Sequence, residues 1–404
     1  MIKNKNNICL EVLYHFCFIV YTTLSLFAFS PVVYKFSPYI SQKELFTIAN
    51  WVAFAVLTLI YILKPHKNKK EVLAELSVAV VFIIATFTNQ TVSNVFHLTQ
   101  WTMFFVVGMF IVCATVTTFK RISITSLLTT VITFIGFSYA SSRNIIEHIV
   151  GYHGDMIAHY MGYYYYSHPS YYMLFAWVTY MYIRGEKKIG WIELFVEAAA
   201  LYKLHTYTTC RLANVCTIAA LVFYIILVKL DLINLQWKIT RIVSTTAFGF
   251  ASVATLLSGF IYSSSNAILD KIKGILSGRL YLVNAAFERY NIKLFGRLIS
   301  PMENEGYFYL DSCYAYSLFG CGLVFFLIVI VMYSYMCYHA CKTNNRHLLV
   351  CLLTLAVFGM VGDVWVHISY TPLILGFFIF LRESNCFSKS IKNTTESTDK
   401  QNPV

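Results

Sequence analysis

The most informative feature of the sequence is a succession of long apolar runs separated by short polar stretches. A helix crosses the hydrocarbon core of a bilayer, about 30 Å thick, with about 20 mostly apolar residues. The sequence therefore predicts an all-α fold, a polytopic transmembrane bundle of about twelve spans. Their expected limits are 8–30, 45–63, 72–88, 101–119, 122–140, 168–183, 189–205, 211–229, 241–262, 312–338, 346–364 and 369–381.

Composition excludes a water-soluble fold. The chain is 58% hydrophobic and 12% charged, whereas soluble domains carry roughly 25% charged residues. Aromatic residues make up 17% of the chain, which suits rings at membrane interfaces. The apolar run after MIKNKNN is similar to a signal peptide, but no small-residue cleavage site follows Phe29 and a second apolar run comes soon after. We expect a retained first helix.

The distribution of basic residues predicts the orientation. About two thirds of the 31 Lys and Arg residues fall in loops on one side of the predicted spans, and such loops are usually cytoplasmic. Both termini are then cytoplasmic, and the two long loops 141–168 and 263–311 face outward. Residues 1–381 form one membrane domain. The segment 382–404 is rich in Ser, Thr, Asn and Lys, which predicts a disordered cytoplasmic tail.

The two outward loops concentrate the polar side chains. Loop 263–311 carries cations against the insertion bias, which favours a binding purpose and an anionic substrate. These cations are Lys271, Lys273, Arg279, Arg289, Lys293 and Arg297. Loop 141–168 carries Arg143, Glu147, His148, His153, Asp155, His159 and His168 among many tyrosines. After Gly278, apolar residues recur at helical spacing, which predicts a short amphipathic helix.

Four stretches place reactive side chains at the outer ends of spans. Arg211 opens a span, where its guanidinium either snorkels to headgroups or clamps a diphosphate. Asp311 either caps a helix or pairs with a loop arginine. His168 precedes Pro169 at a helix entrance. The tyrosines of 161–172, including Tyr165, form either an aromatic belt or stacking platforms for sugar rings.

The order of these features resembles Wzy-type O-antigen, capsular and exopolysaccharide polymerases. The shared features are His-Pro entering a span, an arginine opening a later span, Ser-Gly-Arg at 277–279, Leu-Phe-Gly at 294–296, and YFYLDSCYAYSLFGCG at 307–322. The likeness covers about Met161 to Gly322. The chain departs from the family in having Ser170 where Asn is frequent, and Cys210 and Leu212 where Ser and Thr flank the arginine.

The resemblance implies a metal-independent glycosyltransferase without a cofactor. It would transfer a growing glycan from undecaprenyl diphosphate to a lipid-linked oligosaccharide repeat unit, outside a bacterial cytoplasmic membrane. A chain-length regulator and a flippase are the partners such a protein has, and nucleic acid is not among them. The candidate catalytic residues are His168, Arg211, Arg279 and Asp311. The candidate substrate-binding residues are Arg143, His153, Tyr165, Arg289, Arg297 and Tyr309.

Two alternatives stay open from the sequence. An O-antigen ligase-like transferase shares the lipid diphosphate donor and the helical architecture. A transporter or flippase of lipid-linked sugars belongs to a different class; it would show internal repeats, which this sequence lacks. Transporters also place ionisable residues within spans, and Glu193 and Glu197 are the close pair that fits. A local pairing with Arg or Lys explains that pair equally well.

Overall fold

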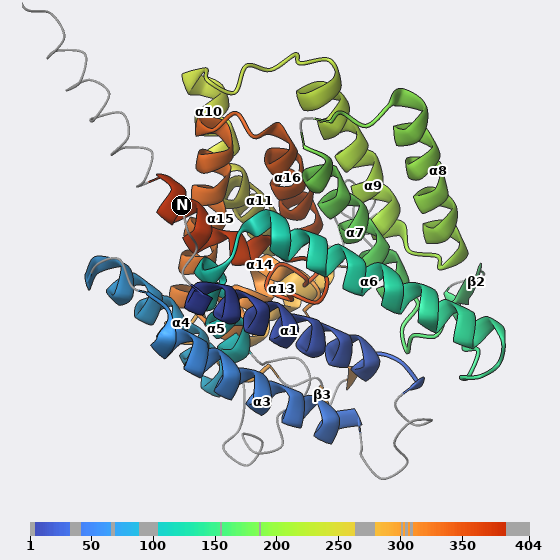
Figure 1. Cartoon of the computed structure of the whole chain (residues 1–404). Coiled ribbons are helices and arrows are strands. Elements are labelled where there is room, and N and C mark those ends of the chain that lie inside the picture. Colours follow the sequence, from blue (N-terminus) through green and yellow to red (C-terminus); the bar gives the residue numbers. More distant parts are fainter. Residues whose placement is uncertain are drawn as a thin grey trace, which may run out of the picture.

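The computed structural model describes residues 5–32, 42–65, 69–88, 104–153, 156–185, 187–262, 279–299, 302–303, 306–307 and 310–384. Within these ranges the chain is a helical bundle with two short β-hairpins (Figure 1). The α-helices are α1 (Lys5–Ala28), α3 (Gln42–Leu63), α4 (Lys69–Thr88), α5 (Phe104–Cys113), α6 (Phe119–Ser142), α7 (His168–Arg184), α8 (Trp191–Tyr207), α9 (Arg211–Tyr224), α10 (Lys238–Thr245), α11 (Ala247–Phe260), α13 (Arg279–Arg289), α14 (Cys313–Tyr316), α15 (Leu323–Lys342) and α16 (Arg346–Gly359). Tighter or wider turns form η2 (Ala114–Val116), η3 (Ile225–Lys229), η4 (Ser317–Cys321) and η5 (Leu373–Leu375), and the strands are β1 (Val150–His153), β2 (Met156–His159), β3 (Met302–Glu303) and β4 (Gly306–Tyr307).

The lengths and the apolar character of the helices agree with a polytopic helical membrane protein. In the described part of the chain, six helices are long and apolar enough to cross a bilayer: Asn7–Ala28, Glu44–Leu63, Lys69–Thr88, Phe119–Ser142, Arg211–Lys229 and Leu323–Lys342. The pair α10 and α11, bent by 48°, would be a seventh span. The expected spans 168–183 and 189–205 correspond to α7 and α8, which have 17 residues each.

Aromatic packing holds the first helices together. α1 lies against α3 and α6, and α4 lies against α5. The Tyr14 hydroxyl donates to the Phe110 carbonyl oxygen at 3.3 Å, and the Phe18 ring meets the Phe110 ring edge-on at 5.8 Å. A Cβ added at Gly108 would lie 2.8 Å from Phe82 Cβ, so the small residue sets the close approach of α5 to α4. Such small-residue contacts are typical of helix pairs in lipid.

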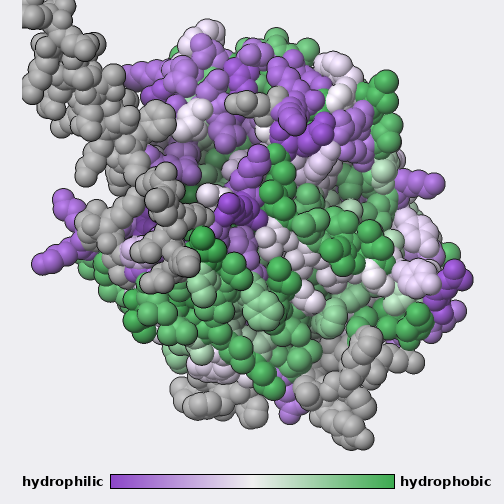
Figure 2. Space-filling view, in the orientation of Figure 1, coloured by the Kyte–Doolittle hydropathy of each residue, from purple (hydrophilic) through white to green (hydrophobic). Residues whose placement is uncertain are grey.

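Apolar side chains cover much of the outer surface of the bundle. Figure 2 shows hydrophobic residues spread over the faces of α1, α3 and α4, with hydrophilic residues gathered along the top edge. Phe16 is 64% exposed and Ile62 is 69% exposed. A soluble monomer rarely exposes apolar patches of that extent, whereas a lipid-facing surface requires them.

One end of the bundle, which we call the charged end, gathers ionic groups from distant segments. Lys64 Nζ lies 2.7 Å from Glu75 Oε1 with both side chains buried. Arg382 pairs with Glu71, and Arg121 pairs with Glu11. All these residues come from loops or helix ends that the sequence assigned to the cytoplasmic side. Their meeting agrees with the predicted alternation of the spans, and the direction across the membrane stays a prediction.

Four of the sequence-based boundaries were wrong. The span expected at 312–338 is broken at Gly322, whose φ of +95° lies in the left-handed region that ends a helix. The span expected at 346–364 ends at Gly359, and residues 360–372 lack helical structure. The final helix covers 376–384 and therefore begins after the predicted 369. The tail expected from residue 382 consequently starts too early, since 382–384 are helical; the rest of it lies outside the described residues.

The two loops predicted to face outward also contain strands that the all-α prediction did not include. β1 pairs with β2 and β3 pairs with β4, each pair antiparallel. Both hairpins are short, so the helical class of the bundle is unchanged.

Candidate functional site

The short amphipathic helix predicted after Gly278 is confirmed and packs into the bundle. Helix α13 buries Leu280 and Val283, and a Cβ added at Gly259 of α11 would lie 2.3 Å from Val283 Cγ1. The Phe287 ring meets Phe319 edge-on at 4.9 Å. The apolar face of α13 therefore lies against protein rather than on lipid headgroups, and this packing fixes the position of its first residue, Arg279.

Arg279 forms an ion pair with Asp311. The guanidinium Nη2 lies 2.8 Å from Asp311 Oδ2, and the two side chains remain 20% and 28% exposed. This contact decides between the two roles that the sequence left open for Asp311. The cap of α14 is Ser312, whose hydroxyl accepts from the Ala315 amide at 3.4 Å. Asp311 thus orients an arginine that a ligand can still reach.

A second carboxylate, Asp363, lies close to this pair. The surrounding protein raises the pKa of Asp311 to about 6, because burial outweighs the opposing effect of Arg279, and the charge of Asp363 adds to the increase. Asp363 is not among the residues predicted from the sequence. A carboxylate between Gly362 and Val364 in an apolar run was the signal that could have identified it, because ionisable residues within spans are usually functional.

Helix α7 and the start of α9 complete the surroundings of Arg279. Tyr171 lies close enough to Arg279 and Asp311 for their charges to act on it. Cys210 precedes α9 and lies close to Arg279, Tyr171 and Ser170. The Ser170 hydroxyl shares a hydrogen bond with the Thr208 hydroxyl at 2.5 Å. Ser170 and Cys210 are two of the positions at which the chain departs from the polymerase pattern. The two departures therefore lie near each other, between α7 and the start of α9.

His168 is buried one turn before Tyr171 on α7. Its ring lies 4.7 Å from Phe29, 5.7 Å from Tyr165 and 6.1 Å from Tyr370. Its Nδ1 atom has no hydrogen-bond partner among the described residues. A buried nitrogen without a partner carries a desolvation cost, which a bound hydroxyl group would remove.

The remaining predicted arginines lie at helix ends or in the loop after α13. Arg211 is the first residue of α9, adjacent to Cys210, and its side chain is exposed. Arg289 ends α13 and is exposed. Arg297 donates to the Asn291 carbonyl oxygen at 3.1 Å. Arg143 follows α6 and lies over the Tyr139 ring at 5.6 Å.

The other candidate substrate-binding residues are Tyr165, His153 and Tyr309. Tyr165 is 47% exposed, and its ring centroid lies 4.8 Å from that of Tyr166. His153 ends strand β1, but its side chain lies outside the described part of the structure, as does Tyr309 entirely. Of the predicted catalytic residues, the structure joins Arg279 to Asp311 directly. It places Arg211 and His168 on the two helices that flank this pair.

Two glycine-containing motifs meet beside the site, in a contact that we call the glycine clasp (residues 293–297 with 320–324). The Arg297 amide donates to the Gly320 carbonyl oxygen at 2.8 Å, and the Leu323 amide donates to the Lys293 carbonyl oxygen at 2.9 Å. A Cβ added at Gly296 would lie 2.0 Å from that Gly320 oxygen. The Leu-Phe-Gly and Gly-Cys-Gly sequences are therefore two halves of one backbone contact, which secures the loop after α13.

The site lies at the end of the bundle opposite the charged end. Helix α15 begins next to the glycine clasp, and near its other end His339 lies 3.5 Å from Glu383, the neighbour of Arg382. A helix of 20 residues is about 30 Å long, the thickness of a bilayer core. Comparison of the chain with protein-family models, with curated proteins and with solved structures found no match.

Proposed function

We propose that the protein is a polysaccharide polymerase that transfers a growing glycan from undecaprenyl diphosphate to a lipid-linked repeat unit. The observation that supports this best is the partly exposed Arg279–Asp311 ion pair next to the start of α9, where Arg211 lies. The reaction expels a lipid diphosphate, and fixed cationic donors lower the barrier by stabilising its developing charge. A planar guanidinium oriented by a carboxylate suits two phosphate oxygens.

The acceptor half of the reaction requires a hydroxyl group held in line with the sugar carbon under attack. His168, whose Nδ1 has no hydrogen-bond partner in the described part of the chain, is our candidate for orienting that hydroxyl or taking its proton. Tyr171 connects the two halves, because it lies on the same face of α7 as His168 and within the field of Arg279.

The proposal includes the predicted topology: about twelve spans in a bacterial cytoplasmic membrane, both termini cytoplasmic, and the site outside. It is supported by the roughly 30 Å between the two ends of α15. The transporter alternative lost its main support, because Glu193 pairs with Arg184 at 3.2 Å and Glu197 accepts from Trp177 at 2.9 Å. Labelling of engineered cysteines at Ser265 and Lys400 from outside tests the topology, and labelling of both would contradict it.

The decisive experiment supplies purified protein with lipid-linked repeat units in excess chelator. The wild type should form polymer, while Arg279→Ala and Arg211→Ala should leave single repeat units unjoined. Arg279→Lys should form little polymer, because an ammonium group lacks the planar fork of donors that a guanidinium has. Lys203→Ala, an exposed cation on α8, is the matched control and should polymerise normally.

The outcomes separate the alternatives. Polymer of normal length from both alanine variants would refute the assignment of the arginines. A ligase would join the glycan to a different lipid acceptor and form no polymer from repeat units alone. A flippase would move the repeat unit across vesicles without joining it. Activity that chelator abolishes and magnesium or manganese restores would contradict a metal-independent reaction.

A further inference from the structure

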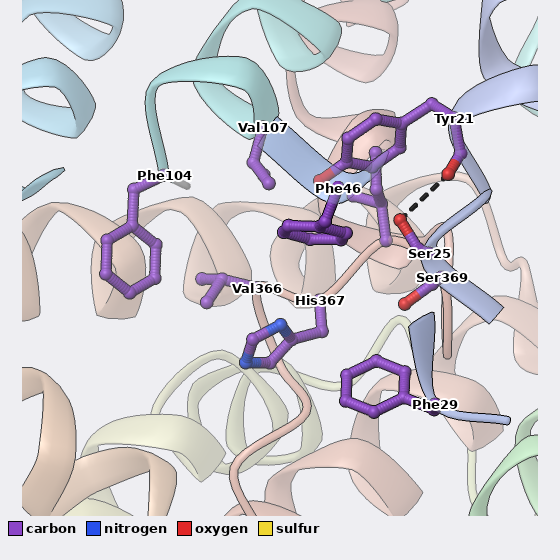
Figure 3. A pocket seen from close by; sticks show the side chains of 10 residues that line it. Tyr21, Ser25, Phe29, Phe46, Phe104, Val107, Val366, His367 and Ser369 are labelled. Carbon is purple, nitrogen blue, oxygen red and sulfur yellow. Dashed lines mark hydrogen bonds between the residues drawn. The ribbon is translucent and has the colours of Figure 1, made fainter. Parts of the chain in front are cut away.

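A small cavity lies between the first helices and the non-helical segment 360–372. Its volume is about 30 Å³, and apolar or aromatic side chains form most of its wall. Figure 3 shows the imidazole of His367 inside this ring of side chains, with Ser25 and Ser369 on one side. The lining residues are Tyr21, Ser25, Phe29, Phe46, Phe104, Val107, Val366, His367, Ile368 and Ser369.

The cavity adjoins the candidate site through shared aromatic side chains. Phe29 belongs to the cavity wall and also contacts His168 at 4.7 Å. On the other side, the His367 ring lies 6.3 Å from Tyr370, and Tyr370 lies 6.3 Å from Tyr171. Tyr171 in turn lies within the field of Arg279. The cavity and the surroundings of His168 therefore share the Phe29 side chain as a common wall.

Segment 360–372 buries apolar side chains but leaves two titratable side chains partly exposed. Val364, Trp365 and Ile368 are buried, whereas Asp363 and His367 reach accessible surface. Backbone without helical structure at membrane depth is tolerated where protein covers it. Protein covers most of this segment, with Asp363 near the ion pair and His367 in the cavity.

The size and chemistry of the cavity restrict what it can bind. A water molecule needs about 10–15 Å³ of such space, so the cavity holds two or three non-hydrogen atoms and excludes a whole sugar ring. Its aromatic walls suit a methylene group. His367, Ser25 and Ser369 suit a hydroxyl group, because histidine and serine can both donate and accept hydrogen bonds.

We propose that this cavity is a specificity subsite for the exocyclic hydroxymethyl group of the acceptor sugar. The inference rests on the proposed polymerase function and adds the part of the substrate that the cavity recognises, the hydroxymethyl group. The methylene would lie among Phe29, Phe46 and Phe104, and the hydroxyl would hydrogen-bond to His367 or to a serine. A 6-deoxy sugar could not form this hydrogen bond, and sites built to hydrogen-bond a substrate hydroxyl discriminate strongly against analogues that lack it.

The test fills the cavity with a conservative change, Ser25→Val. Ser77→Val is the matched control, because Ser25 and Ser77 each donate to the carbonyl oxygen four residues earlier at 2.8 Å within a helix, and Ser77 is exposed. Initial rates are measured with lipid-linked repeat units from cells that lack polymerase. Ser25→Val and His367→Gln should raise the acceptor KM about tenfold, and Ser77→Val should leave it unchanged.

A competition assay tests whether the cavity recognises the exocyclic hydroxyl group. Methyl glucoside, galactoside and mannoside are compared with their 6-deoxy analogues as inhibitors of polymerisation. In at least one pair the hexoside should inhibit about tenfold better, and Ser25→Val should abolish that difference. Equal inhibition in every pair, or an unchanged KM in Ser25→Val, would overturn the subsite. If the wild type forms no polymer, the proposed function itself fails, which is a distinct result.

Discussion

Replacing Gly296 with alanine should open the glycine clasp. The backbone of Gly296 has φ +77°, which costs a residue with a side chain about 1–2 kcal/mol. The added Cβ would lie 2.0 Å from the Gly320 oxygen and 2.5 Å from the Cys321 carbonyl carbon. Both are backbone atoms, so no side-chain rotation relieves the contact, and overpacking of this kind costs about 1–3 kcal/mol.

The penalty can be compared with what holds the clasp closed. Three backbone hydrogen bonds cross it: Arg297 to Gly320, Leu323 to Lys293, and Val324 to Leu294. Each contributes about 1 kcal/mol, so the bonds together supply about 3 kcal/mol. The strain of Gly296→Ala, about 2–5 kcal/mol, is of the same size. We expect the clasp to open locally while the bundle stays folded.

Hydrogen–deuterium exchange of the purified protein measures this opening. Peptides that cover 293–297 and 320–324 should exchange faster in Gly296→Ala, and polymer formation should fall because α13 and Arg279 lose their support. Gly249→Ala is the control: nothing lies within 4 Å of a Cβ at this position in α11, and alanine favours a helix by about 1 kcal/mol. Unchanged exchange and activity in Gly296→Ala would refute the proposed role of the clasp.

Three further predictions concern other parts of the molecule. Glu75→Ala should lower stability by about 3–5 kcal/mol because it leaves Lys64 buried without its partner; a thermal-unfolding scan should show partial recovery in the double variant Lys64→Met/Glu75→Leu. The raised pKa of Asp311, about 6 against an ordinary 3.8, means that its carboxyl is ionised above pH 6 and protonated below it. Activity that depends on its pair with Arg279 should therefore fall as pH drops through about 6, and the pH profile of the residual activity in Asp311→Asn should lack this step. Cysteines placed at His168 and Arg279 should crosslink with a short reagent, and failure to do so would contradict a shared site.

The sequence determined the features that depend on local composition. Apolar runs predicted a polytopic helical bundle, and helical spacing after Gly278 predicted α13 with Leu280 and Val283 on its buried face. The residues of the ion pair, Arg279 and Asp311, were also identified from the sequence. These predictions were possible because hydropathy and helical period are properties of a local stretch of sequence. They are the same whatever tertiary fold the chain adopts.

The tertiary structure decided the features that join distant parts of the chain. It also decided those that depend on a single backbone dihedral angle. Hydropathy treats Gly322 as part of a span, but its positive φ ends the helix and gives α15 a separate start. Asp363 was hidden in an apolar run, and its position near Arg279 depends on the path of segment 360–372. The proximity of Ser170 to Cys210 and the meeting of the two halves of the glycine clasp likewise depend on packing. Such contacts are set by which helices pack together, and that choice minimises the free energy of the whole bundle rather than of any one segment.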